Sequence, residues 1–282
     1  MILQVLLPLI LAFIMFSLGL GLRGSDFSRV LKFPVPFLAG LLNQVVLLPL
    51  VALGLSYIFK LDQIFAVGLM IIAMCPGGVT SNMLAKLAGG NAPLSISLTA
   101  VTSLLSIVTV PILVSFSVVH FMGENAPPVN VTKLGLTMFL ITAVPVALGM
   151  VITAKSSDMV NKIAPGISKL AVGLFVLIVI LALAKNWEVF FENLATLGPV
   201  AISLIMLMLG LGLATAKLMR LDKKNATTIS IESGVQNGTL AIQISSLINI
   251  AYGFPAAVYS LFMYFTASIP IMIGLKKAKE EV

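Results

Sequence analysis

Apolar residues fill long runs along this chain, and short polar stretches separate one run from the next. Each run is about 20 residues long, the length that an α-helix needs to cross the hydrocarbon core of a bilayer. Nine such segments are predicted, at roughly 4–22, 35–59, 63–88, 92–121, 134–154, 166–184, 194–216, 225–250 and 254–275. The pattern therefore predicts an all-α polytopic membrane protein.

The composition agrees with this prediction. Of the 282 residues, 59% are hydrophobic and 10% are charged, and the mean hydropathy is +1.13. Soluble domains carry about 25% charged residues. A soluble fold would lack the polar surface it needs, so we expect the lipid bilayer to surround the chain.

The basic residues predict the orientation. Of the 17 Lys and Arg residues, only Lys60, Lys133 and Lys185 fall in connections on one side of a nine-span arrangement. The others fall on the opposite side, and basic connections are typically cytoplasmic. We predict a protein of the cell inner (plasma) membrane with its N-terminus outside and its C-terminus in the cytoplasm. The net charge of +7 is then a topology signal, and no nucleic-acid partner is expected. The oligomeric state stays open, and a monomer fits the sequence.

Several residues narrow the chemistry. Residues 1–22 lack a basic n-region and a clear cleavage site, so we expect a retained helix rather than a signal peptide. Cys75 is the only cysteine, which excludes an internal disulfide and a cysteine-based metal cluster. His120 is the only histidine and lies near an outer loop. No HExxH, GxSxG or phosphate-loop pattern occurs, so we predict neither an enzyme nor an organic cofactor.

Two segments are interrupted near their middle by polar and flexible residues. The third reads "CPGGVTSNMLAKLAGG", with Pro76 removing a backbone donor and two glycines loosening the helix. The eighth reads "ESGVQNGTLA", and Glu232 is the only charged residue between about Asn225 and Ile250. Carboxylates at membrane depth usually mark functional sites, and paired interruptions point to the binding site of a transporter.

The two interruptions align with each other. Gly78-Val79 matches Gly234-Val235, and Leu84-Ala85 matches Leu240-Ala241, at a constant offset of 156. The third and eighth segments also run in opposite directions, as an inverted repeat requires. We expect a first repeat over 1–121 with a broken helix near 76–82, an unpaired fifth helix with linkers over 122–165, and a second, inverted repeat over 166–282 with a broken helix near 232–238.

The interruptions and their neighbours carry one carboxylate and several neutral oxygens, without sulfur or imidazole. Hard cations prefer such ligands, and without a run of carboxylates for calcium a monovalent ion, sodium above all, fits best. The residues concerned are Gln44, Thr80, Ser81, Asn82, Ser95, Thr99, Glu232, Gln236 and Asn237. Structural roles stay open for several of them. Serine and threonine often bond back to their own helix, and the amides could tie helices or satisfy loose backbone groups.

"CPGGVTSNMLAKLAGGNAPLSISLTAVTSLL" together with "IESGVQNGTLA" resembles the bile acid:sodium symporter family. The resemblance covers almost the whole chain. It implies an inverted-repeat transporter in which two crossing discontinuous helices belong to a core domain and a separate panel domain moves against that core. It also implies symport of an organic anion, either a small carboxylate or a bile-acid-like molecule, with two Na⁺ ions by alternating access.

The resemblance implies two sodium sites that share Glu232. The first would use Ser81, Asn82, Ser95, Thr99 and Glu232. The second would use Gln44, Glu232 and Gln236, with the backbone carbonyls of Ser233 and Val235. The anion would bind near Val79, Thr80 and Asn237, where it would offset the net positive charge of two ions and one carboxylate.

The chain departs from the family in two respects. We predict nine spans where members usually have ten, and the missing one corresponds to the first helix. Some relatives carry a histidine-asparagine pair in the last helix, where this chain reads Phe265, Thr266 and Ala267. The second departure weakens any transfer of bile-acid contacts, and small carboxylates stay open as substrates.

Three other functions compete with symport. A cation/proton antiporter of related architecture could use Glu232, although such proteins commonly need a close pair of acids. An arsenite-type carrier would use Cys75 as a soft ligand. A receptor or scaffold that transports nothing is a different class, and the short loops offer nothing in its favour.

Overall fold

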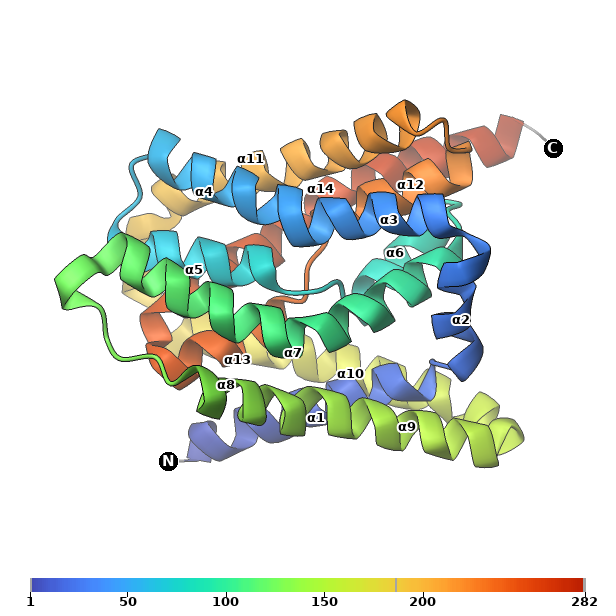
Figure 1. Cartoon of the computed structure of the whole chain (residues 1–282), viewed down its shortest axis with the longest axis horizontal. Helices are drawn as coiled ribbons and strands as arrows, with labels where there is room; N and C mark the ends of the chain where they lie inside the picture. Colours follow the sequence, from blue (N-terminus) through green and yellow to red (C-terminus); the bar gives the residue numbers. More distant parts are fainter. Residues whose placement is uncertain (1, 186, 281–282) are drawn as a thin grey trace.

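The computed structural model describes residues 2–185 and 187–280, and within these ranges it contains helices and no strand. Helices coincide with all nine predicted segments. In chain order they are α1 (Ile2–Leu20), α3 (Pro34–Leu42) with α4 (Leu48–Ile58), α5 (Gln63–Met74) with α6 (Val79–Leu87), α7 (Ala92–Met122), α8 (Val131–Met138) with α9 (Val144–Lys155), α10 (Ser157–Lys185), α11 (Trp187–Leu218), α12 (Lys223–Gly234) with α13 (Gly238–Ile248), and α14 (Gly253–Glu280). Most run along the long axis of the molecule (Figure 1).

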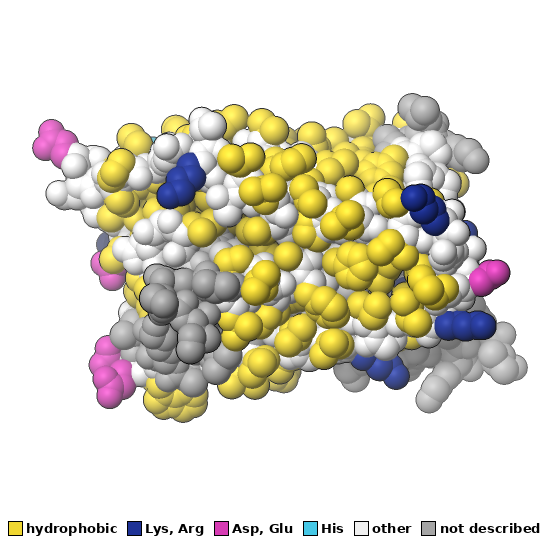
Figure 2. All heavy atoms as spheres, turned by 90° about the horizontal axis from the view of Figure 1, so that it is seen from below, with side chains coloured by type: hydrophobic (Ala, Val, Ile, Leu, Met, Phe, Trp, Pro, Cys, Tyr) yellow, Lys and Arg dark blue, Asp and Glu magenta, His cyan; other side chains and the backbone are white. Residues whose placement is uncertain are grey.

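Several helical stretches are long and apolar enough to cross a membrane. By length and composition alone, the described part of the chain contains five: Pro34–Ile58, Ala92–Asn125, Val131–Lys155, Phe191–Leu218 and Ile250–Ser268. The pair α5 and α6, bent by 64°, makes a sixth if it counts as one span. Figure 2 shows one apolar face between two ends that carry charged side chains. The predicted class, an all-α polytopic membrane protein, is confirmed.

Several of the described basic residues lie near the ends of helices. Arg23, Lys86, Lys155 and Lys217 are exposed at or just after the ends of α1, α6, α9 and α11. These four helix ends lie together at one end of the molecule, on the right in Figure 1. The prediction of orientation also used six basic residues whose side chains lie outside those that the structure describes: Arg29, Lys32, Lys185, Lys276, Lys277 and Lys279.

Some boundaries differ from the prediction. Helix α2 (Gly24–Lys32) fills what was predicted as a connection, because Asp26 accepts a hydrogen bond from the Arg23 N–H and caps a polar helix that hydropathy does not detect. Helix α10 begins at Ser157 rather than near 166, so the predicted boundary at 165/166 falls inside a helix that accommodates Pro165. Polar first turns explain why apolar runs underestimate such helices.

Two π-helical turns each precede a proline. The turn η1 (Asn43–Leu47) lies between α3 and α4 and is followed by Pro49, and η3 (Phe139–Ala143) lies between α8 and α9 and is followed by Pro145. A proline gives no N–H to the carbonyl four residues before it, and membrane helices commonly absorb that loss by local π-helical adjustment. Because Gln44 lies in η1, this adjustment occurs beside a predicted sodium ligand.

Helices α1, α8, α9 and α10 form a group along one side of the molecule, at the bottom of Figure 1. Two glycines let α1 and α9 approach closely. A Cβ on Gly19 would collide with the Val146 carbonyl oxygen, and a Cβ on Gly149 would lie 2.6 Å from the Phe16 carbonyl oxygen. Small residues at such crossings are typical of membrane helix packing. This group faces the interrupted helices across a cavity described below.

Candidate functional site

The two interrupted helices meet where each one is broken. Residues Cys75–Gly78 separate α5 from α6, and Val235–Asn237 separate α12 from α13. The Asn237 N–H donates a hydrogen bond to the Pro76 carbonyl oxygen at 2.8 Å, so one interruption touches the other. The first interruption lies slightly earlier than the predicted range of 76–82. Ser81 Oγ accepts a hydrogen bond from the Gly78 N–H and so caps the start of α6, which makes Thr80–Asn82 part of that helix.

Glu232 lies in the last turn of α12 and is fully buried. Its Oε1 accepts a hydrogen bond from Ser95 Oγ at 2.6 Å. Its Oε2 accepts from Thr99 Oγ1 at 3.0 Å and from Gln44 Nε2 at 3.2 Å. These three donors are neutral, so their hydrogen bonds partly compensate the burial of the carboxylate but do not neutralise its charge.

The oxygens around Glu232 outnumber the hydrogens available to them. Ser95 Oγ also lies 2.7 Å from Asn82 Oδ1, and Thr99 Oγ1 lies 3.1 Å from the same oxygen. Ser95 and Thr99 thus each approach two oxygens, one of Glu232 and one of Asn82, which makes four contacts between oxygens. Each hydroxyl has only one hydrogen, so only two of these four contacts can be hydrogen bonds. In the other two contacts no hydrogen lies between the oxygens, so their lone pairs face each other. A cation bound among these oxygens would interact favourably with all of them.

Gly77 allows the backbone to approach this cluster. A Cβ at position 77 would lie 2.7 Å from Glu232 Oε2, 2.8 Å from Ser81 Oγ and 3.2 Å from Thr99 Oγ1. These three oxygens therefore surround one point next to the glycine. The structure thus brings together all five residues of the predicted first site, and it also gives Gly77 a reason that the sequence did not supply.

The second predicted site contains two glutamines in the same unusual state. Gln44 Nε2 donates to the Glu232 carbonyl oxygen at 2.9 Å, and Gln236 Nε2 donates to that oxygen at 3.1 Å and to the Ser233 carbonyl oxygen at 2.9 Å. The Oε1 atoms of both glutamines are buried and have no hydrogen-bond partner. A buried carbonyl without a donor is costly, and here two of them flank one carboxylate residue. Val235, the remaining member, is fully buried in the interruption between them.

Cys75 is the only cysteine of the chain and lies at the start of the first interruption, where it lines a cavity together with Gln44. Among the described residues, no group of three or more His, Cys, Asp or Glu side chains could hold a metal ion. His120 is exposed near the end of α7, where its Nε2 lies 2.5 Å from Tyr57 Oη. The oxygen-only donor set fits sodium better than zinc or copper.

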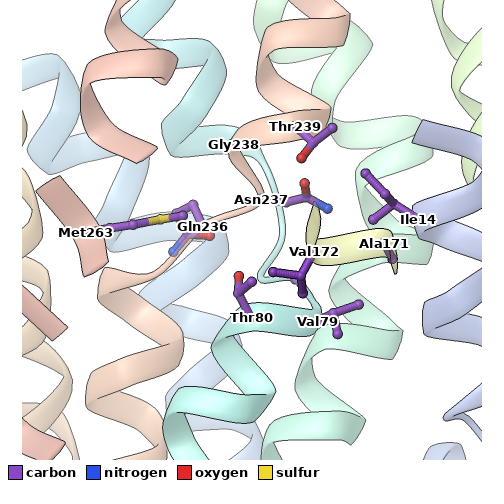
Figure 3. A pocket seen from close by; sticks show the side chains of 11 residues that line it. Ile14, Val79, Thr80, Ala171, Val172, Gln236, Asn237, Gly238, Thr239 and Met263 are labelled. Carbon is purple, nitrogen blue, oxygen red and sulfur yellow. The ribbon is translucent and has the colours of Figure 1, made fainter. Parts of the chain in front are cut away.

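A small cavity, with about 30 Å³ open to the centre of a water-sized molecule, lies between the interruptions and the α1–α10 side of the molecule (Figure 3). It brings together the three predicted substrate residues, Val79, Thr80 and Asn237. Gln236, Gly238 and Thr239 extend its polar wall, and the apolar wall comes from Ile14 of α1, Ala171 and Val172 of α10, and Met263 of α14. Helices α6 and α13 both begin at this cavity, so two helix N-termini point their positive dipole ends at it.

Some residues of the site were not predicted. The apolar members of the cavity wall carry no sequence signal, because periodicity does not distinguish a cavity-facing apolar residue from a lipid-facing one. Tyr259 of α14 is fully buried and donates to the Gly234 carbonyl oxygen at 2.8 Å, which fixes the end of α12 next to Glu232. A tyrosine in an apolar helix gives no hint of this role.

Known proteins resemble this chain over nearly its whole length. Residues 8–193 match the family described as the Sodium Bile acid symporter family. The uncharacterized sodium-dependent transporter YocS of Bacillus subtilis is 28% identical over 98% of this chain and 84% of its own length. Human sodium/bile acid cotransporter 4 is 32% identical over 92% of this chain, which spans only 61% of that protein. The probable sodium/metabolite cotransporter BASS1 of Arabidopsis thaliana is 26% identical over 82% of this chain and 57% of its own length.

These relatives are named as transporters, and none is named as an enzyme. The matched regions include the first interrupted helix, and the alignments with the relatives extend beyond the family match. Together with the helical fold and the buried carboxylate, the match assigns the class: this chain belongs to the Sodium Bile acid symporter family.

Proposed function

We propose that this protein is a sodium-coupled symporter of an organic anion and works by alternating access. The observation that carries the proposal is the buried Glu232 carboxylate, which is surrounded by more oxygens than hydrogens and flanked by two glutamine oxygens without partners. Such a donor set suits a hard monovalent cation. The names of the relatives support sodium as that cation.

Two sodium ions would share Glu232. One would bind Ser81, Asn82, Ser95 and Thr99 on one side of the carboxylate. The other would bind Gln44 and Gln236, with help from the carbonyls of Ser233 and Val235. Two positive charges against one carboxylate leave a net positive charge, which an anion in the neighbouring cavity would offset.

The cavity favours an anion with an apolar part. The N-termini of α6 and α13 offer backbone N–H groups and positive dipole ends, and Thr80 and Asn237 add polar side chains. Ile14 and Val172 give the cavity an apolar surface on the side of α1 and α10, and Met263 adds another beside Gln236 (Figure 3). The space open to the centre of a water-sized molecule is about 30 Å³, well below the usual ligand-pocket range of about 300–1,000 Å³, which favours a small carboxylate over a sterol.

Coupling follows if sodium orders the contact between the two interruptions. The backbone around Glu232, Gln236 and Asn237 joins the ion ligands directly to the cavity wall. An ion that fixes this backbone raises affinity for the anion, and by linkage the anion raises affinity for the ion. The group of α1, α8, α9 and α10 would then act as the panel domain. It would move against an inverted-repeat core that contains the crossing helices, and this movement would open the cavity to either side of the inner membrane.

Uptake into proteoliposomes tests this proposal. An inward sodium gradient should drive accumulation of a small carboxylate, whereas an equal potassium gradient should not. The alternative, a cation/proton antiporter that uses Glu232, predicts sodium-driven proton movement without any anion, which an internal pH dye would detect. Proton movement alone would overturn symport and support the antiporter.

A further inference from the structure

A second cavity lies on another side of the interruptions, between η1, the end of α5 and the middle of α7. It is small, with about 20 Å³ open to the centre of a water-sized particle, and its wall includes Gln44, Cys75, Pro76, Thr102, Ser106 and Thr109. We call it the side chamber. It shares no lining residue with the cavity of Figure 3, and its lining includes no charged side chain.

The side chamber continues a line of hydroxyl groups that begins at Glu232. Along α7 these groups lie at Ser95, Thr99, Thr102, Ser106 and Thr109, with spacings of four, three, four and three residues. Residues three and four apart share one face of a helix. The first two members contact Glu232, and the last three line the side chamber. One helix face therefore connects the chamber with the buried carboxylate.

The hydroxyls of the chamber present oxygen rather than hydrogen to its interior. Thr102 Oγ1 donates to the Leu98 carbonyl at 2.8 Å, and Ser106 Oγ donates to the Ser103 carbonyl at 2.7 Å. Thr109 Oγ1 donates to the Leu105 carbonyl at 3.1 Å. Each hydrogen is thus committed to the helix backbone, and the remaining lone pairs favour a cation or the water molecules that surround one.

Gln44 links the chamber to the ion ligands. Its Nε2 atom is held by Glu232, while its Oε1 atom is buried without a partner and its side chain lines the chamber. Gln236 is in the same state but lines the cavity of Figure 3 instead. The two amides stand beside the same Glu232 carbonyl oxygen, and each belongs to a different cavity.

We propose that the side chamber is the entry site for sodium with part of its water shell, so that sodium and the anion reach the interruptions from different cavities. Neutral oxygens suit this role, because a conducting site must bind an ion well enough to admit it and weakly enough to release it. An ion between Gln44 and Gln236 then separates the two cavities. This inference rests on the proposed sodium-coupled function.

The first test changes two chamber hydroxyls and follows the kinetics. The double variant Thr102→Val, Ser106→Ala should slow the onset of anion transport after a sodium jump by about tenfold, because it removes two oxygens from the ion's route. At saturating sodium, the anion concentration for half-maximal transport should not change. Ser117→Ala is the matched control, since Ser117 is also buried on α7 and bonds back to its helix but does not line the chamber.

The results separate this inference from the proposed function. An unchanged onset in the double variant, with sodium-dependent transport in the native protein, would overturn the chamber and leave symport intact. Native protein without any sodium dependence would overturn both. A double variant with a slow onset and a weakened anion affinity would also contradict the inference, because it would show that the two cavities are not separate.

A second test uses the native chain and covers the case in which the double variant fails to fold. Cys75 is the only cysteine and lines the chamber, so it reports on what enters. A small cationic methanethiosulfonate reagent should label it in proteoliposomes, and sodium but not potassium should slow the labelling. Cys75→Ala supplies the blank. A labelling rate that sodium does not change, including no labelling, would contradict the proposal.

Discussion

Replacing Glu232 by Gln preserves the size of the side chain and removes its charge. In the native protein, Ser95, Thr99 and Gln44 donate to this carboxylate, and both proposed sodium ions depend on it. The new amide group would also place N–H hydrogens among oxygens that now lack them. We therefore expect Glu232→Gln to lose sodium binding at both sites while the protein remains folded.

The expected loss is large. A unit charge about 4 Å from a carboxylate gains about 4 kcal/mol at an effective dielectric constant of about 20. At about 1.4 kcal/mol per factor of ten, this corresponds to roughly a thousandfold weaker sodium affinity. Sodium at a hundred times its dissociation constant stabilises the native protein by about 2.7 kcal/mol, and after a thousandfold loss that contribution falls below about 0.1 kcal/mol.

Equilibrium binding of radioactive sodium to the purified protein measures this loss, and a melting curve in potassium checks the fold. In potassium the variant should melt at the native temperature or above it, because a neutral amide replaces a buried carboxylate whose charge no basic group in the described part of the chain neutralises. Glu124→Gln is the matched control, since Glu124 is exposed in η2 (Gly123–Asn125). Sodium binding that survives in Glu232→Gln would refute the shared-ligand assignment.

Three further changes probe the rest of the site. Replacing Ser95 and Thr99 together by alanine should reduce the number of sodium ions bound from two to one, and a stoichiometry that stays at two would show that the first site lies elsewhere. Gly77→Ala should lose sodium binding with little loss of expression, because its Cβ would lie within 3.2 Å of three cluster oxygens; unchanged binding would show that the cluster can move aside. Asn237→Ala removes the cap that α13 receives at the Leu240 N–H, and it should destabilise the protein by about 1 kcal/mol and raise the anion concentration for half-maximal transport. A change in stability without a change in transport would limit Asn237 to capping.

Much of the site was visible in the sequence because polar residues are conspicuous in apolar surroundings. Glu232 alone in its run, and Pro76 with its glycines, signalled two interruptions that the structure places in contact. From the residues alone, some of these polar side chains could have bonded only to their own helix. The family resemblance then supplied specific sets of sodium ligands. The structure places Ser95 and Thr99 on the carboxylate itself.

Other features had no sequence signal. The cavity wall formed by Ile14, Val172 and Met263 combines helices that are distant in the chain, and apolar patterns do not show which apolar face lines a cavity. The offset of 156 between the two repeats would place the start of α13 at Val235, because α6 begins at Val79. The structure begins α13 at Gly238, three residues later. Capping decides these positions: Ser81 holds the start of α6, and Asn237 holds the start of α13.

The most direct measurement is the melting temperature of the purified protein with a panel of small carboxylates and bile acids, first in sodium and then in potassium. A ligand at a hundred times its dissociation constant adds about 2.7 kcal/mol, which such a measurement detects. We predict a rise in sodium alone, and a further rise with at least one small carboxylate only when sodium is present. Equal melting temperatures in sodium and potassium with every anion would contradict the account, because Glu232 and its surrounding oxygens would then bind no sodium.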